Sequence, residues 1–229
     1  MKKTVLALSG GMDSTTLLAM LLDQGDEVHA MIFYYGSKHN RWENQAARHV
    51  INYYQHKDFP LSEYSIDLSG VMQHFQSDLL LTGGDIPEGH YEDENMKQTV
   101  VPGRNMIFAS ILAGLTKSIG ATQIALGVHS GDHHIYPDCR KEFIKTLDSA
   151  VYLSSGKTVE VTTPLIDDDK TSILLRGAAL KVPYQLTRTC YKDQELSCGR
   201  CGACNERLEA FDAIGEHDPI PYEVPLGVM

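Results

Sequence analysis

The stretch that most constrains the fold is residues 9–14, which read Ser-Gly-Gly-Met-Asp-Ser. It follows an apolar segment, residues 4–8, that is typical of a buried parallel strand, and it precedes residues 15–22, which favour a helix. At such a strand-to-helix turn, glycines let the backbone approach a ligand, and the free N–H groups of the first helical turn attract an anion. A glycine pair alone would fit an ordinary turn, but the two serines and Asp13 beside it favour a phosphate-binding loop.

This loop is not of the Walker type, because it lacks the Gly-Lys-Ser or Gly-Lys-Thr sequence that such a loop requires. It resembles the pyrophosphate-binding loop of the N-type ATP pyrophosphatases, which split ATP between its α and β phosphates and adenylate an oxygen of the substrate. By this resemblance, Ser9 and Ser14 hold phosphate oxygens and Asp13 holds Mg²⁺. These three are therefore the expected catalytic residues.

Short apolar runs alternate with helical patterns along most of the chain, and Gly25 marks the end of the first helix. The expected strands are residues 4–8, 27–35, 62–68, 123–127 and 158–163, and the expected helices are residues 15–22, 41–54, 106–118, 141–153 and 168–175. This order predicts an α/β fold with a doubly wound, mostly parallel five-stranded sheet. A chain of 229 residues suits one such domain with a small appendage.

Twenty basic and thirty acidic residues give a net charge of −10. This balance argues against an extended nucleic-acid-binding surface and favours a small-molecule substrate. The apolar run before residue 9 is too short for a signal peptide, and none approaches the roughly eighteen residues of a membrane helix. We expect a cytoplasmic protein with no membrane or nucleic-acid partner.

Residues 82–99 are rich in glycine and acidic side chains and lack any helical or strand periodicity. A loop of this length in a compact domain is usually a lid, a binding loop or a disordered segment. Composition does not separate a mobile lid from plain disorder, so both interpretations stay open.

Four of the five cysteines, Cys190, Cys198, Cys201 and Cys204, lie within fifteen positions, with a glycine inside each of the last two intervals. This spacing predicts a closed, structural Zn²⁺ site. The main alternative is an iron–sulfur cluster, because the last three cysteines match the first three ligands of a ferredoxin motif. The fourth cysteine of that motif and the proline after it are missing, and we therefore favour zinc.

Four features occur here in the order found in one family: the loop at residues 9–14, Val-Pro-Gly-Arg-Asn at 101–105, Tyr-Pro-Asp-Cys-Arg-Lys-Glu-Phe at 136–143, and the four cysteines. Over essentially its whole length the chain resembles the 7-cyano-7-deazaguanine synthases of queuosine and archaeosine precursor synthesis. These are ligases that convert 7-carboxy-7-deazaguanine to the nitrile with ATP and ammonia. The chain departs from the family pattern at Ser37 and Lys38, where many relatives have glutamine and arginine, and in the spacing from His39 to Glu43.

The resemblance implies an adenine-nucleotide α-hydrolase fold and a homodimer. Residues 1–185 would form the ATP pyrophosphatase domain, and residues 186–229 a zinc-binding segment packed on it. Mg·ATP would be held by residues 8–18, which are Leu8, Ser9, Gly10, Gly11, Met12, Asp13, Ser14, Thr15, Thr16, Leu17 and Leu18. The base would lie near Arg104, Asn105, Tyr136, Asp138 and Arg140. We add Asp132, because it follows the carboxyl end of a predicted strand, where ligands of parallel sheets bind.

Three other functions remain open: an amide-forming variant of the same family, a tRNA-modifying enzyme with the same ATP loop, and a zinc-stabilised nucleotide sensor. The charge of −10 argues against the second. Once the metal takes four thiols, only Cys139 is left to serve as the nucleophile of a glutamine amidase. We therefore expect ammonium, rather than glutamine, to supply the nitrogen.

Overall fold

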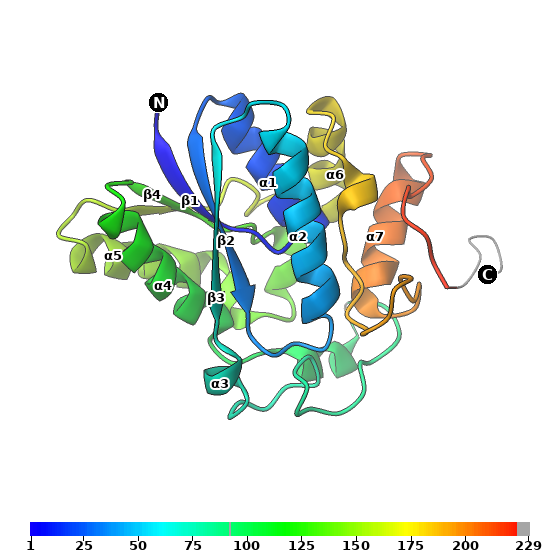
Figure 1. The fold of residues 1–229 in the computed structure, drawn as a ribbon. Helices are drawn as coiled ribbons and strands as arrows, with labels where there is room; N and C mark the ends of the chain where they lie inside the picture. The colour runs from blue at the N-terminus through cyan, green and yellow to red at the C-terminus, as the bar shows by residue number, and fades with distance from the viewer. Residues whose placement is uncertain (92, 224–229) are drawn as a thin grey trace.

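The computed structural model describes residues 1–91 and 93–223. Its centre is a parallel five-stranded sheet with the strand order β3-β2-β1-β4-β5 (Figure 1). The strands are β1 (Lys3–Ala7), β2 (Glu27–Tyr34), β3 (Leu61–Asp67), β4 (Gln123–Ala125) and β5 (Glu160–Thr162). The predicted doubly wound α/β fold is therefore confirmed.

Helices cover both faces of the sheet (Figure 1). On one face lie α1 (Met12–Asp23), α2 (Asn40–Gln55) and α6 (Lys170–Ala179), and on the other lie α4 (Arg104–Ser118) and α5 (Lys141–Ser154). In β2, Met31 and Phe33 pack in the layer of α4, whereas Ala30 and Ile32 pack in the layer of α1. Burial on both faces explains why the central strands read as continuous apolar runs.

Three helix starts differ by two or three residues from those expected, and the first of them is α1, which begins at Met12 rather than at residue 15. The last predicted helix begins at Lys170 rather than at residue 168, because the Asp169 side chain caps it by accepting a hydrogen bond from the Ser172 N–H at 2.7 Å. Helix α4 begins at Arg104 rather than at residue 106, directly after Gly103, whose φ of +65° favours glycine. Two helices, the short α3 (Ser69–Met72) and α7 (Gly202–Ala213), were not among the expected elements.

The segment at residues 82–99 packs against the rest of the protein, leaving aside residue 92, which lies outside the described part. Ile86, Tyr91 and Met96 are buried in the same core as α4, and Glu94–Thr99 forms a 3₁₀ helix. This packing contradicts the interpretation of the segment as plain disorder. Its apolar anchors are too widely spaced to show helical or strand periodicity, which is why the sequence did not reveal them.

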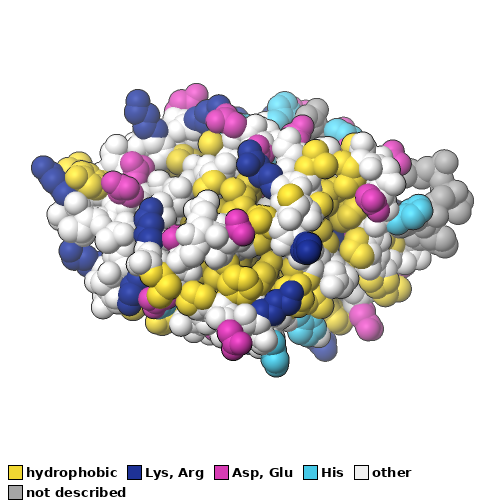
Figure 2. Space-filling view, turned by 90° about the horizontal axis from the view of Figure 1, so that it is seen from above, with side chains coloured by type: hydrophobic (Ala, Val, Ile, Leu, Met, Phe, Trp, Pro, Cys, Tyr) yellow, Lys and Arg dark blue, Asp and Glu magenta, His cyan; other side chains and the backbone are white. Residues whose placement is uncertain are grey.

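The C-terminal segment packs against the outer side of α6 through α7 (Figure 1). Arg207 of α7 is fully buried, and it forms an ion pair with Asp218 and donates a hydrogen bond to the Thr187 hydroxyl. On the face in Figure 2, Lys and Arg side chains are scattered among Asp and Glu, and hydrophobic side chains gather between them. Among the described residues, no helix is both long enough and apolar enough to cross a membrane.

Candidate functional site

The predicted phosphate loop joins β1 to α1 and lines a cavity at the carboxyl ends of the strands. Gly10 has a φ of +78°, and a Cβ there would lie 2.3 Å from the backbone nitrogen of Ala47, so only glycine lets the loop lie against α2. The hydroxyls of Ser9 and Ser14 are 3.0 Å apart, and the Ser9 oxygen accepts a hydrogen bond from the Gly11 N–H. Because α1 begins at Met12, its first-turn N–H groups can serve as donors to an anion.

Asp13 belongs to a cluster of charged side chains beside this loop. The Lys170 ammonium donates to both Asp13 carboxylate oxygens at 2.9 Å and lies 3.1 Å from a Glu206 carboxylate oxygen. Nε2 of His129 lies 3.7 Å from Asp13 and 3.6 Å from Asp132. Nδ1 of His129 accepts a hydrogen bond from the Gly131 N–H, which orients the ring. The cluster combines three carboxylates with one buried ammonium.

The opposite charges of this cluster stabilise the ionised forms of Asp13 and Lys170. Burial alone would raise the pKa of the Asp13 carboxyl, but Lys170 and His129 together hold this pKa below its usual value. Burial alone would lower the pKa of Lys170, whereas Asp13 and Glu206 raise it above its usual value. Asp13 is therefore an anion and Lys170 a cation at neutral pH. Burial raises the pKa of Glu206, an effect that Lys170 opposes.

Aromatic side chains and one arginine form the other half of the cavity. The Arg104 guanidinium lies 5.9 Å from the ring centre of Tyr35 and 5.7 Å from that of Tyr136. The Tyr91 hydroxyl donates to Asp132 at 2.8 Å, which connects the 82–99 segment to the cavity wall. The cavity is open to solvent on one side and has a volume of about 210 Å³, somewhat below the roughly 300–1,000 Å³ typical of small-molecule sites.

The structure brings most, but not all, of the predicted site residues to this cavity. Those that line it are Leu8, Ser9, Gly11, Met12, Asp13, Ser14, Arg104, Asn105, Asp132 and Tyr136. Gly10 faces α2 instead, and Thr15, Thr16, Leu17 and Leu18 are buried within α1.

Two of the residues expected near the base do not line the cavity. Asp138 accepts a hydrogen bond from the Asn105 N–H at 2.9 Å, and so it positions a residue of the wall. Arg140 is exposed, and its Nε donates to the His133 carbonyl at 2.9 Å. Two departures from the family pattern, Ser37 and Lys38, are also away from the cavity, since they contact residues 78–84. The third departure is the spacing from His39 to Glu43, and both of these residues line the cavity.

Sequence reasoning missed several residues of the wall: Tyr35, His39, Glu43, His129, Lys170, Arg188, Tyr191 and Glu206. One signal was available for Lys170, because a cation in the first turn of a helix opposes the helix dipole and therefore suggests a partner. Glu206 carried no such signal. It reaches the cluster only because α7 packs against α6.

The four cysteines predicted to bind metal lie together and are buried. Their sulfur atoms all lie within 4.8 Å of one another. Backbone N–H groups of Cys198 and Cys201 donate to sulfur atoms of the cluster at 3.3 Å, as occurs around metal-bound thiolates. In a tetrahedral site with metal–sulfur distances of about 2.3 Å, the sulfurs are about 3.8 Å apart, and Cys198 and Cys204 are 3.9 Å apart. The donor set fits a single metal ion.

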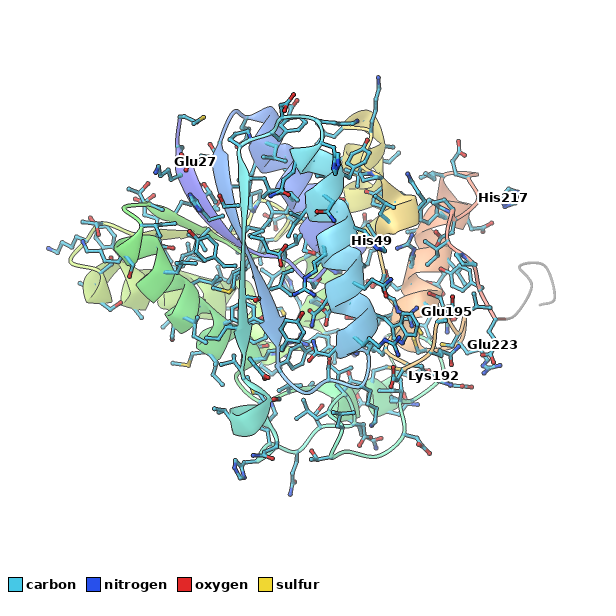
Figure 3. The ribbon with its side chains drawn as sticks, viewed as in Figure 1. Glu27, His49, Lys192, Glu195, His217 and Glu223 are labelled. Carbon is cyan, nitrogen blue, oxygen red and sulfur yellow. The ribbon has the colours of Figure 1, made fainter. Side chains whose placement is uncertain are left out.

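The 82–99 segment is attached to this cysteine cluster. Glu88 forms an isolated antiparallel bridge with Cys201, and the Gly89 N–H donates to the Arg200 carbonyl at 3.1 Å. Glu88 also forms ion pairs with Lys192 and with Arg200. Figure 3 shows Lys192, Glu195 and Glu223 close together at the outer rim of this region. The cluster therefore holds the segment that carries Tyr91 to the cavity.

Comparison with known sequences gives a consistent result. A family model described as "Queuosine biosynthesis protein QueC" matches residues 3–215. The 7-cyano-7-deazaguanine synthase of Pseudoalteromonas atlantica is 42% identical over 222 residues, which cover 97% of this chain and 99% of that protein. The synthase of Caldicellulosiruptor bescii is 44% identical over 224 residues, which cover 98% of this chain and 99% of that protein.

Comparison with solved structures shows a shared fold at low identity. A 4-thiouridine synthetase, solved with RNA and bound ATP, has a TM-score of 0.53 at 17% identity, covering 91% of this chain and 50% of that chain. The tRNA thiolase NcsA of Methanococcus maripaludis, solved with its 4Fe-4S cluster, has a TM-score of 0.52 at 16% identity, covering 93% of this chain and 65% of that chain. At such identities the likeness concerns the fold alone.

Proposed function

Because this chain belongs to the QueC family of queuosine biosynthesis proteins, we propose that it is a ligase that converts 7-carboxy-7-deazaguanine and ammonia to 7-cyano-7-deazaguanine at the expense of ATP. The observation that carries this proposal is the shared cavity. One end is the phosphate loop with Ser9, Asp13 and Ser14, and the other is the aromatic region around Arg104 and Tyr136. Such a cavity can hold a nucleotide and a flat ring side by side.

The reaction has to remove two oxygens from one carbon. Transfer of AMP to the substrate carboxylate, with release of pyrophosphate, makes one oxygen a good leaving group. Ammonia then displaces AMP and gives the amide. A second ATP activates the amide oxygen in the same way, and loss of AMP and a proton leaves the nitrile. The amide must remain bound while the nucleotide exchanges, which is a role for the Arg104 region beneath the segment that carries Tyr91.

The nitrogen donor in this proposal is ammonium. Burial, assisted by Asp132 and Asp138, raises the pKa of the Cys139 thiol, which also accepts a hydrogen bond from the Asn105 side chain at 3.2 Å. A thiol kept protonated in this way is a poor nucleophile for glutamine hydrolysis. Nitrogen supply from free ammonium avoids the need for such a nucleophile.

The purified chain is expected to use two ATP per carboxylate, to require ammonium, and to be inactive with glutamine alone. It is also expected to convert synthetic 7-amido-7-deazaguanine to the nitrile without ammonium, because the amide lies on the reaction path. Analysis of the deazaguanine products, together with AMP and pyrophosphate assays, measures these outcomes. An amide that accumulates and is refused when supplied would instead identify an amide-forming variant.

Two other functions are distinguishable by simple assays. A nucleotide sensor would bind ATP without releasing AMP and pyrophosphate when the carboxylate is added. A tRNA-modifying enzyme would bind tRNA at moderate salt, which the net charge of −10 disfavours. The tRNA enzymes with similar structures share only the fold, so they do not favour this alternative.

We assign Mg²⁺ to the carboxylates beside the phosphate loop, with Asp13 as the main ligand. The donor set fits, because Asp13, Asp132 and Glu206 offer the hard oxygen ligands that Mg²⁺ prefers. Both Asp13 oxygens accept a hydrogen bond from Lys170, and each keeps a second lone pair with which to bind Mg²⁺. Phosphate oxygens would then serve as new acceptors for the Lys170 ammonium.

We assign Zn²⁺ to the four cysteines of residues 186–229, a segment that packs on the ATP pyrophosphatase domain of residues 1–185. Sulfur atoms within 4.8 Å of one another suit a single ion, whereas a four-iron cluster lies between its thiolates and holds them farther apart. Reduced cysteines and the biosynthetic substrate both favour a cytoplasmic location.

The homodimer implied by the family would form through α4. The outward-facing side of this helix carries Met106, Ile107, Ser110, Ile111 and Gly114, and its one charged residue is Lys117. A helix so apolar on its exposed side is usually covered by another element. Because Ser110 and Gly114 are small and four residues apart, two copies of α4 can approach closely across a twofold axis.

Gly114→Arg is expected to convert a dimer to a monomer in sedimentation velocity experiments at micromolar concentration. A Cβ at this position meets no atom within 4 Å, so the change does not disturb the fold of the single chain. Gln45→Arg, at an exposed position of α2, is the matched control and should sediment as the wild type does. A monomeric wild type, or a dimeric Gly114→Arg variant, would rule out this interface.

A further inference from the structure

One carboxylate of the cavity wall, that of Glu43, has no role in the mechanism described above. Glu43 lies in the first turn of α2, and its side chain is 14% exposed. Its Oε2 lies 3.4 Å from Nε2 of His39 and accepts no hydrogen bond within the described part of the chain. A buried carboxylate oxygen without a donor is costly, and in a cavity wall a bound ligand can supply the missing donor.

The neighbours of Glu43 do not supply the missing charge. Burial, together with Arg104 and Arg188, lowers the pKa of His39 to about 3, so His39 is neutral at physiological pH. Arg104 lies between the rings of Tyr35 and Tyr136 and forms no ion pair within 4 Å among the described residues. Burial accordingly raises the pKa of Glu43 to about 7, an effect that Arg104 opposes.

The walls around Glu43 suit a flat ring. Tyr35, Phe108, Tyr136 and Tyr191 all line this part of the cavity, and the Phe108 ring stacks on Phe33 with a centre-to-centre distance of 3.9 Å. Aromatic rings and the guanidinium of Arg104 offer stacking surfaces. A ligand held there presents only its edge to the Glu43 carboxylate.

Two parallel hydrogen bonds to a carboxylate require two adjacent N–H donors in one plane. The 2-amino-4-oxopyrimidine half of a deazaguanine has such an edge, formed by the ring N–H and the neighbouring amino group. Adenine offers one amino donor beside an acceptor, and ammonium has no planar edge. Of the three substrates of the proposed reaction, the deazaguanine therefore matches this carboxylate best.

We propose that the Glu43 carboxylate binds the ring N–H and 2-amino group of the deazaguanine and so selects for a 2-amino-4-oxopyrimidine ring. The assignment rests on the proposed function and adds to it the residue that recognises the base. It also differs from the expectation that Asp138 and Arg140 bind the base, since neither lines the cavity.

The test compares 7-cyano-7-deazaguanine with its analogue lacking the 2-amino group, using calorimetric titration of the full-length protein. The wild type is expected to prefer the first ligand by roughly 10- to 100-fold. In Glu43→Gln, which keeps one acceptor but loses the charge, the preference should fall to a few-fold. Glu142→Gln, at an exposed position in the first turn of α5, is the matched control.

The preference should also depend on pH. The ionised carboxylate binds the ligand, so affinity is complete above about pH 7 and decreases as the pH falls through that value. The groups around Glu43 are His39, Arg104 and Tyr35, with Arg188 beside His39. Among them His39, with a pKa of about 3, does not titrate in this range, nor do the arginines. Glu43→Gln should bind with no such dependence.

Three results would overturn the proposal: an unchanged preference in Glu43→Gln, a weakening of Mg·ATP binding alone, or an increase in the KM for ammonium alone. The last two would assign Glu43 to adenine or to ammonium instead. Failure of the proposed function has a different signature, because the wild type would then produce no nitrile even though the binding preference can still be measured.

Discussion

Asp13→Asn is expected to lower ATP-dependent turnover by at least about 10³-fold, the scale at which loss of a group that stabilises charge in the transition state usually acts. In the proposed site Asp13 is the main Mg²⁺ ligand beside the phosphate loop, and an amide oxygen is a much weaker ligand for this ion. The measurement is release of AMP and pyrophosphate in the presence of 7-carboxy-7-deazaguanine and ammonium.

The fold should survive this substitution. Asparagine keeps the size of the side chain, and Lys170 keeps Glu206 as a partner at 3.1 Å. Asp23→Asn, at the exposed far end of α1, is the matched control and should retain full activity. Turnover near the wild-type rate in Asp13→Asn, with an unchanged circular dichroism spectrum, would refute the assignment of the loop.

Cys201→Ser is expected to remove the bound metal and to lower the melting temperature by about 10 °C. A closed structural site contributes directly to folding, and the loss of a few kcal/mol shifts the midpoint by about 2–4 °C per kcal/mol in a chain of this size. Elemental analysis should find one zinc per chain in the wild type and much less in the variant. Iron in the wild type would contradict the zinc assignment.

Loss of the metal in Cys201→Ser should also loosen the 82–99 segment. Its Glu88 and Gly89 are held by Cys201, Arg200 and Lys192, so Cys201→Ser should speed proteolytic cleavage within residues 82–99. Cys139→Ser is the control, since this buried thiol lies outside the cluster and its loss should leave the zinc content unchanged. Equal cleavage rates in both variants would show that the cluster does not hold the segment.

The amino-acid sequence by itself determined the strands, the glycine turn at residues 9–14 and the cysteine cluster. Each of these depends on residues that are close together in the chain. The run at residues 4–8 and the glycines after it form a strand and a turn through local geometry, and the intervals between Cys198, Cys201 and Cys204 bring three of the four thiols together. Local spacing is visible in a single sequence because it does not depend on how distant elements pack.

Only the tertiary structure decided which distant residues complete the cavity. Lys170 meets Asp13 across 157 positions because α6 packs against α1, and Glu206 joins them because α7 packs against α6. The 82–99 segment is likewise held by buried anchors and by the cysteine cluster rather than by a pattern of its own. Such contacts follow from the order in which helices stack on the sheet, and this order leaves no periodic signal in the residues that it brings together.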